Sequence, residues 1–334
     1  MERKSASLFA ETGNCGRRVC WTLPRSTSIN GHVTLAAICL LVASSVTHAL
    51  WNLAGKRDQP TPAYFLAANT LGTLAFAWVL VPTASAMAWF PPRLWFLVGL
   101  TGIFQAGYYS ALAGTYRSGD LSVSYPIARA AAVLFIGIVN SILRNGHGPS
   151  PLAWAGMVCI AVGILLLPLE KLSGFRLSRY AHKSTLLALG AAVCTVGYSM
   201  ADSRALSILS TMPDPPWGRT GITLLYSVLE ALSTSTWLTV LVLAAPRQRL
   251  AARQVFTRGL WRTALTGATI FFTYTLVLFA MYLAKDVSYV VAFRQLSVPI
   301  GAALGVLVLG EPLYRLKIIG VVVVTLGLLL VGLG

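Results

Sequence analysis

The chain has 334 residues, of which 56% are hydrophobic and only 11% are charged, and its formal net charge is +16. Soluble domains carry roughly a quarter charged residues, so this composition excludes a water-soluble globular protein. The positive charge does not indicate nucleic acid as a partner, because nearly all Lys and Arg residues lie in short breaks between apolar runs. That distribution is typical of membrane proteins, in which basic residues flank the spans and contact lipid headgroups.

Apolar runs long enough to cross a bilayer recur along the whole chain. A transmembrane helix needs about 20 mostly apolar residues. Ten such spans are predicted, at residues 33–54, 63–82, 94–116, 121–143, 151–168, 184–202, 221–244, 262–284, 287–309 and 315–333. We therefore expect an all-α, multi-pass integral membrane protein with ten transmembrane helices, located in the plasma (inner) membrane.

Charge between the spans is unevenly distributed. Residues 1–32 form a basic tail that we expect to be disordered, and residues 169–183 form a basic linker. Loops on the side of the predicted termini carry 5 Lys and Arg residues, or 10 with the tail, whereas the opposite loops carry 14. The loops and the tail thus favour opposite orientations under the positive-inside rule, and the orientation stays open.

The two halves of the chain repeat each other. Residues 46–57 align with residues 193–204, and Arg129 aligns with Arg294. A similar shift places Gly156 and Gly163 over Gly320 and Gly327. Each half, 33–168 and 184–334, holds five predicted spans, and an odd number forces the copies into opposite orientations. This pattern predicts two inverted five-helix repeats, an architecture that secondary transporters use around a site at the membrane midplane.

Three segments resemble EamA-type domains of the drug/metabolite transporter superfamily. They read ASSVTHALWNLAGKR, GYSMADSRA and FRQLSVPIGAALGVLVLGEPLYRLKIIGVVVVTLGLLL, and the resemblance covers residues 35–333. The first repeat departs from the family ending, because it has Asn145-Gly146 where the second has Gly310-Glu311. The resemblance implies alternating-access transport of a small metabolite across the lipid bilayer in which the protein lies. It does not identify the cargo.

Two arginines lie deep inside predicted spans. Arg129 and Arg294 each lie about eight residues into a span, roughly 12 Å deep at 1.5 Å per residue. Burying such a charge costs about 2.5–3.5 kcal/mol on insertion scales, so these side chains are expected to face the bundle interior. Because a guanidinium group suits a carboxylate or phosphate, we expect the pair to bind an anionic part of the substrate. The alternative is an internal ion pair with a carboxylate such as Glu230.

Two carboxylates accompany the arginines. Glu230 lies about nine residues into the seventh span, where it either couples transport to the proton gradient or pairs with an arginine. Asp202 falls at the predicted end of the sixth span beside Arg204, so a solvated or helix-capping role is expected.

The other candidate residues share helix faces with each other or with the arginines. His48, Trp51 and Asn52 have i, i+3, i+4 spacing on the first span, and they align with a face of the sixth span that holds Tyr198. The predicted substrate site comprises Arg129, Arg294, Gln295, Tyr125, His48, Trp51, Asn52, Tyr198, Gln105 and Tyr109. It lies in a central cavity lined by the first, third, fourth, sixth, eighth and ninth spans.

Other classes of function are less well supported. The GxxxxGK[ST] motif of ATP-driven proteins does not occur, which predicts coupling to a gradient or none. The five cysteines lack metal-ligand spacing, so we expect no metal and no cofactor. The sequence shows no paired-carboxylate or metal cluster of the kind that catalysis needs, so we also expect no enzymatic activity. An enzyme embedded in the membrane and acting on a lipid-linked or amphipathic substrate is the alternative. Gly301-x-x-x-Gly305 predicts a close helix contact, either within the chain or in a homodimer.

Overall fold

The computed structural model describes residues 34–55, 60–117, 121–143, 148–171, 183–212, 218–257 and 260–334. Within these ranges, the side chains of residues 51–55, 116, 121–123, 256–257 and 309 are outside the description. The predicted tail and most of the predicted linker therefore lie outside the described residues.

The described residues are helical and contain no β-strand. The first half comprises α1 (Leu35–Gly55), α2 (Pro62–Phe76), η1 (Ala77–Val79), α3 (Leu80–Thr83), η2 (Ala84–Trp89), α4 (Pro92–Arg117), α5 (Leu121–Leu143) and α6 (Pro151–Leu166). The second half comprises α7 (Lys183–Ser210), α8 (Gly218–Ala244), α9 (Pro246–Thr257), α10 (Leu260–Leu283), α11 (Val287–Phe293), η5 (Arg294–Leu296), α12 (Ser297–Leu309) and α13 (Arg315–Leu333).

Eight helical segments are long and apolar enough to cross a membrane. Two further apolar helices are shorter within the described residues, at Leu35–Leu50 and Pro151–Leu166. The outer surface carries large apolar side chains, and Val81, Leu307 and Trp89 are 86%, 82% and 75% exposed. Such a surface suits a lipid environment, so the chain is a multi-pass helical membrane protein.

Local sequence explains where several helices begin. Thr61 caps α2 by accepting a hydrogen bond from the Tyr64 amide at 3.1 Å, and Ser150 caps α6 through the Ala153 amide at 3.0 Å. Each cap precedes a proline in the first helical turn, where the missing N–H would have no partner. Asp286 caps α11 in the same way, accepting from the Ser288 amide at 2.8 Å.

The predicted ninth span is a broken helix. α11 and α12 are joined by the 3₁₀ turn η5, which contains Arg294 and Gln295. Pro299 lacks the N–H that would bond to the Gln295 carbonyl four residues earlier, so regular α-helical bonding fails at this point. In contrast, α5 continues through Pro126 without a break, so Arg129 lies on a continuous helix and Arg294 on a turn.

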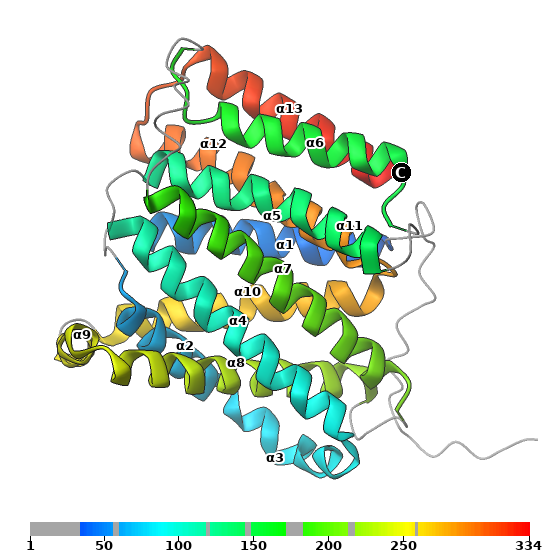
Figure 1. Ribbon diagram of the computed structural model, residues 1–334, viewed down its shortest axis with the longest axis vertical. Helices are drawn as coiled ribbons and strands as arrows, with labels where there is room; N and C mark the ends of the chain where they lie inside the picture. The colour runs from blue at the N-terminus through cyan, green and yellow to red at the C-terminus, as the bar shows by residue number, and fades with distance from the viewer. Residues whose placement is uncertain are drawn as a thin grey trace, which may run out of the picture.

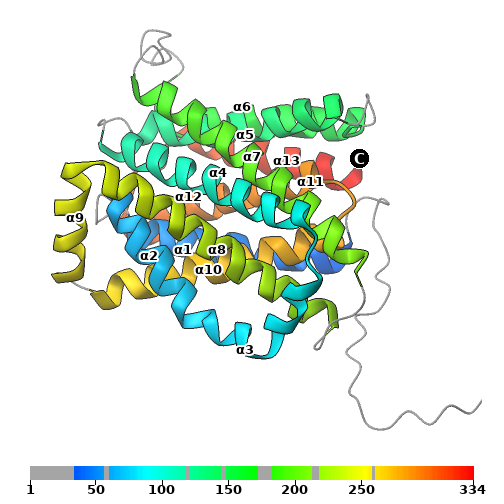
Figure 2. The same cartoon turned by 60° about the horizontal axis from the view of Figure 1, so that its bottom comes forward.

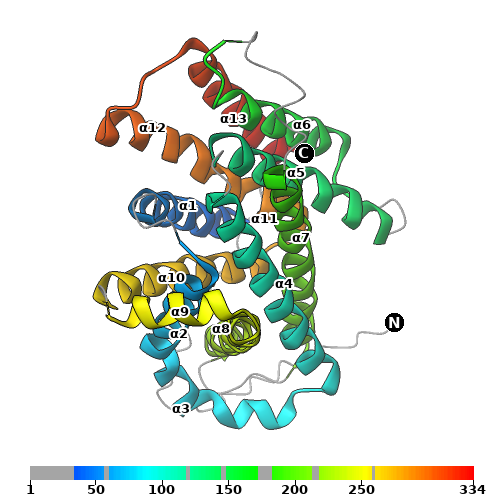
Figure 3. The same ribbon diagram turned by 60° about the vertical axis from the view of Figure 1, so that its left-hand side comes forward.

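The helices form a bundle in which α7 packs against α4 and α5, and these three helices lie along one side of it (Figure 3). Figure 2 shows the long helices running beside one another. α6 and α13 make up one edge, and α3 lies at the opposite edge (Figure 1, Figure 3). α9 lies at one end of the bundle, near α2 and α8, and residue 334 lies at the other end (Figure 1).

Glycines allow two pairs of helices to approach backbone to backbone. A Cβ atom on Gly156 would lie 2.6 Å from the Gly327 carbonyl oxygen, and one on Gly163 would lie 2.8 Å from that of Gly320. All four glycines that the repeat aligns therefore lie at the contact between α6 and α13, where each meets the glycine aligned with the other one of its own helix. α2 and α10 meet in the same manner. The contact predicted at Gly301 is not made within the described chain, since no atom lies within 4 Å of a Cβ placed there, and a contact between two copies stays a prediction.

Candidate functional site

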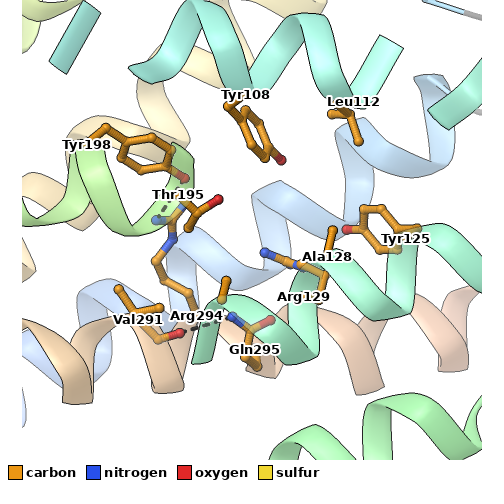
Figure 4. A pocket seen from close by; sticks show the side chains of 11 residues that line it. Tyr108, Leu112, Tyr125, Ala128, Arg129, Thr195, Tyr198, Val291, Arg294 and Gln295 are labelled. Carbon is orange, nitrogen blue, oxygen red and sulfur yellow. Dashed lines mark hydrogen bonds between the residues drawn. The ribbon is translucent and has the colours of Figure 1, made fainter. Parts of the chain in front are cut away.

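A cavity with two lobes lies between the central helices. Both lobes are bordered by Tyr108, Tyr198 and Arg294. The first lobe is further lined by Leu112, Tyr125, Ala128, Arg129, Ala132, Thr195, Val291 and Gln295 (Figure 4). The second is further lined by His48, Gln105, Tyr109, Ile270, Thr273 and Tyr274. These residues come from α1, α4, α5, α7, α10, α11 and η5, which correspond to the six spans that the sequence predicts.

Both arginines reach the first lobe (Figure 4). Arg129 donates a hydrogen bond from Nη2 to Ser297 Oγ, and its guanidinium carbon lies 5.6 Å from the Tyr125 ring centre. Ser297 Oγ donates in turn to the Arg294 carbonyl oxygen at 2.8 Å. Ser297 thereby links the two cationic residues, although they belong to α5 and η5.

Arg294 lies among aromatic rings. Its Nη1 is 3.5 Å from the Tyr198 hydroxyl, and its guanidinium carbon lies 5.9 Å from the Tyr198 ring centre and 5.4 Å from that of Tyr274. Ring faces attract cations and stabilise the group in a desolvated place. They do not neutralise it, so the positive charge remains available to an anion.

No described carboxylate lies within 4.0 Å of either arginine. The one ion pair among the described residues joins Lys317 and Glu311, at 3.2 Å. Glu230 is 3% exposed, accepts a hydrogen bond from Thr234 at 3.4 Å and is not among the residues that line either lobe. The ion pair between Glu230 and an arginine, which was one of the two roles predicted for Glu230, is therefore not formed.

A row of tyrosines separates the lobes. The Tyr108 and Tyr198 rings pack edge to face with centres 6.0 Å apart, and the Tyr198 and Tyr274 rings do so at 5.7 Å. Edge-to-face pairs are favourable because the positive ring edge meets the negative ring face. The row gives each lobe an apolar wall with hydroxyl groups along it.

Several polar atoms around the cavity are buried and have no hydrogen-bond partner in the described structure. They are Arg129 Nε, Gln105 Nε2 and Gln295 Oε1. The Gln295 amide is anchored through Nε2, which donates to the Val291 carbonyl at 3.1 Å. An unpaired buried polar group costs about 1–3 kcal/mol, so these three atoms mark an incompletely satisfied polar interior around the cavity.

Asp202 lies in a different place from the one predicted. α7 extends to Ser210, so Asp202 is two turns inside the helix and 0% exposed rather than solvated or capping. It accepts hydrogen bonds from the Tyr226 hydroxyl, at 2.7 Å, and from the Tyr274 hydroxyl. Tyr274 thus contacts Arg294 with its ring and Asp202 with its hydroxyl, which connects the cavity to a buried carboxylate.

Most of the predicted site residues meet at this cavity. Those with a described position on its lining are Arg129, Arg294, Gln295, Tyr125, His48, Tyr198, Gln105 and Tyr109. The side chains of Trp51 and Asn52 lie outside the described residues, and Glu230 lies behind the lining. The predicted set lacked Tyr108 and Tyr274, although both are aromatic residues in the middle of apolar spans. No group of three or more metal-ligating side chains occurs within the described ranges.

Comparison with known proteins supports the fold but does not name a family. No protein-family model matches the chain, and no curated protein matches it. A solved crystal structure, described only as a protein, has a similar fold with a TM-score of 0.60 and 17% identity. The similarity covers 92% of this chain and 99% of that one, and at this identity it speaks for the fold alone.

Proposed function

We propose that the protein is a secondary transporter of EamA type that carries a small metabolite with an anionic group. The observation that carries this proposal is the pair Arg129 and Arg294, two guanidinium groups that share one interior cavity without a described carboxylate partner. A membrane protein that only needed a stable core would be expected to pair or omit such charges, because their burial is costly. An anionic ligand supplies the missing counter-charge.

The proposed architecture is ten spans in two inverted repeats, with α1 and α6 crossing the membrane beside the eight longer segments. Arg129 and Arg294 occupy matching positions in the two halves and reach one cavity, as a site on a pseudo-two-fold axis requires. η5 adds support, because broken helices beside a central site are common in transporters of this architecture.

Glu230 and Asp202 are the proposed coupling groups. Both are buried carboxylates without a described cationic partner, and Asp202 is connected to Arg294 through Tyr274. Binding of an anion to Arg294 would compete with its contact to the Tyr274 ring. This competition would link binding of cargo in the cavity to the protonation of Asp202 and Glu230. If Glu230→Gln protein in vesicles accumulated cargo with an unchanged response to a proton uncoupler, Glu230 would not be the coupling group.

A binding screen tests the cargo class. Thermal unfolding of the detergent-purified protein is measured with carboxylates, phosphorylated metabolites, neutral sugars and amines, since ligands stabilise the state that binds them. Anions should raise the midpoint, and Arg129→Ala and Arg294→Ala should lose that shift. Arg204→Ala is the matched control, because Arg204 is exposed on α7 outside the cavity. A shift with neutral or cationic compounds only, retained in both variants, would refute the anion site.

A further inference from the structure

The segment between α8 and α10 folds as a basic helix where the apolar pattern leaves only a loop. α9 carries Arg247, Arg249 and Arg253 and contains no acidic residue. Pro246 begins it, which is a favourable first position for proline. With 12 residues, α9 is too short to cross a bilayer, so its arginines lie at the surface of the bundle rather than inside a span.

α9 has an inner apolar side and an outer basic one. It packs against α2, α8 and α10 at one end of the bundle (Figure 3), and Val255 contacts an apolar cluster beneath it. The three arginines are exposed, and Leu250, between two of them in sequence, is 61% exposed. Exposed leucine among arginines is typical of an amphipathic helix that lies in the membrane interface.

The residues that follow α9 indicate its depth in the membrane. Trp261, in the first turn of α10, is 67% exposed, and the Arg262 guanidinium carbon lies 5.8 Å from its ring centre. Tryptophan is enriched where lipid headgroups meet the hydrocarbon core. α9 directly precedes this turn and therefore lies at headgroup depth.

The two ends of the bundle differ in charge. Among the described residues, the end with α9 carries Arg117, Lys171, Lys183, Arg247, Arg249, Arg253, Arg262, Arg315 and Lys317, whereas the other end carries Arg93, Arg204, Arg219 and Lys285. Two described carboxylates accompany the first group, Glu170 and Glu311, and Glu311 is paired with Lys317. Basic residues concentrate on the cytoplasmic side of membrane proteins, where the leaflet is rich in anionic lipids.

We propose that α9 binds anionic lipid headgroups through Arg247, Arg249 and Arg253, and that the basic loops rather than the basic tail decide the orientation, which puts α9 at the cytoplasmic face of the membrane. A guanidinium group has five N–H donors, so Arg249, whose Nε donates to the Leu243 carbonyl at 2.6 Å, still has Nη groups for charge-assisted hydrogen bonds to a lipid phosphate oxygen. Each basic side chain near an anionic surface strengthens binding by roughly fivefold. This inference does not depend on transport, since it concerns a surface outside the cavity.

Lipid titration of the detergent-purified protein tests the inference. Phosphatidylglycerol and phosphatidylcholine with identical acyl chains are added separately, and the thermal midpoint is followed at low and high salt. The wild type should be stabilised at lower concentrations of phosphatidylglycerol, and about 0.5 M NaCl should remove the difference because salt screens exposed charges. Arg247→Gln/Arg249→Gln should need roughly 25-fold more phosphatidylglycerol for the same shift.

Two matched variants separate charge from folding effects. Arg247→Lys/Arg249→Lys keeps the charge and should restore the preference for phosphatidylglycerol. Arg93→Gln/Arg204→Gln removes the same charge from exposed positions at the other end and should leave it unchanged. Equal stabilisation of the wild type by both lipids would overturn the proposal, and so would an equal loss in the Arg93→Gln/Arg204→Gln protein.

Discussion

Replacing Arg294 by alanine gives the sharpest test of the cavity. The substitution removes a guanidinium group that contacts two tyrosine rings and has no described carboxylate partner. Because no ion pair is broken, the unliganded protein should keep most of its stability. The loss should instead fall on the complex with an anion.

The size of the loss follows from the hydrogen bonds that disappear. Bonds to a charged group contribute about 1.5–3 kcal/mol, or roughly 10–150-fold in the dissociation constant. At a ligand concentration 100 times the dissociation constant, a ligand stabilises the wild type by about 2.7 kcal/mol. After a 100-fold loss of affinity, the same concentration stabilises by only about 0.4 kcal/mol. Arg294→Lys should lie between these values, because it retains the charge but not the planar fork.

Thermal unfolding with and without the best anion from the screen measures both quantities. Unliganded midpoints show whether folding is intact, and the shift on adding ligand reports binding. Arg204→Ala should behave as the wild type in both. An Arg294→Ala protein that kept the full ligand-induced shift would refute the view that this residue binds the anion.

Three further predictions concern packing, the tyrosine link and orientation. Gly163→Ala should lower the free energy of unfolding by about 1–3 kcal/mol, because its new methyl group would clash with the α13 backbone. Gly99→Ala is the control, since its Cβ would enter open space, and it should have no such effect. Equal destabilisation by both variants would contradict the packing. Tyr274→Phe should destabilise the fold by about 1–3 kcal/mol because Asp202 loses a donor, yet keep the anion-induced shift because the ring remains. Gly334 lies at the end of the bundle opposite α9 (Figure 1), and the proposal places that end outside the cytoplasm. Alkaline phosphatase fused after Gly334 should therefore be active, and a fluorescent protein fused there should be dark. The reverse result would place the α9 end outside the cell.

The sequence predicts the helices well because apolar length is a local property. Eight of the ten predicted spans are helices long and apolar enough to cross a membrane, and the runs at 33–54 and 151–168 fold as helices that are shorter within the described residues. The alignment of Arg129 with Arg294 predicts two charges that line one cavity. The repeat also singles out four glycines of α6 and α13 that lie at the contact between these helices, although in crossed pairs: Gly156 meets Gly327 and Gly163 meets Gly320. These successes rest on features that recur along the chain.

The failures concern contacts between distant segments. The sequence wrongly predicts a solvated or capping Asp202, because its donors, Tyr226 and Tyr274, belong to other helices and lie 24 and 72 residues away. α9 is missed because a short, arginine-rich helix lacks an apolar run. The close approach at Gly301 is not made within the chain, because a small residue permits a contact without supplying a partner to make it, and the homodimer contact stays a prediction.

The glycine contact between α6 and α13 has a consequence for how the protein can diversify. None of the residues that line either lobe of the cavity belongs to these two helices. Substitutions that alter ligand preference can therefore accumulate in the cavity while the edge keeps its tight packing. Selection can act on binding and on this part of the scaffold separately, so related chains could differ widely in cargo and still share the same rigid border.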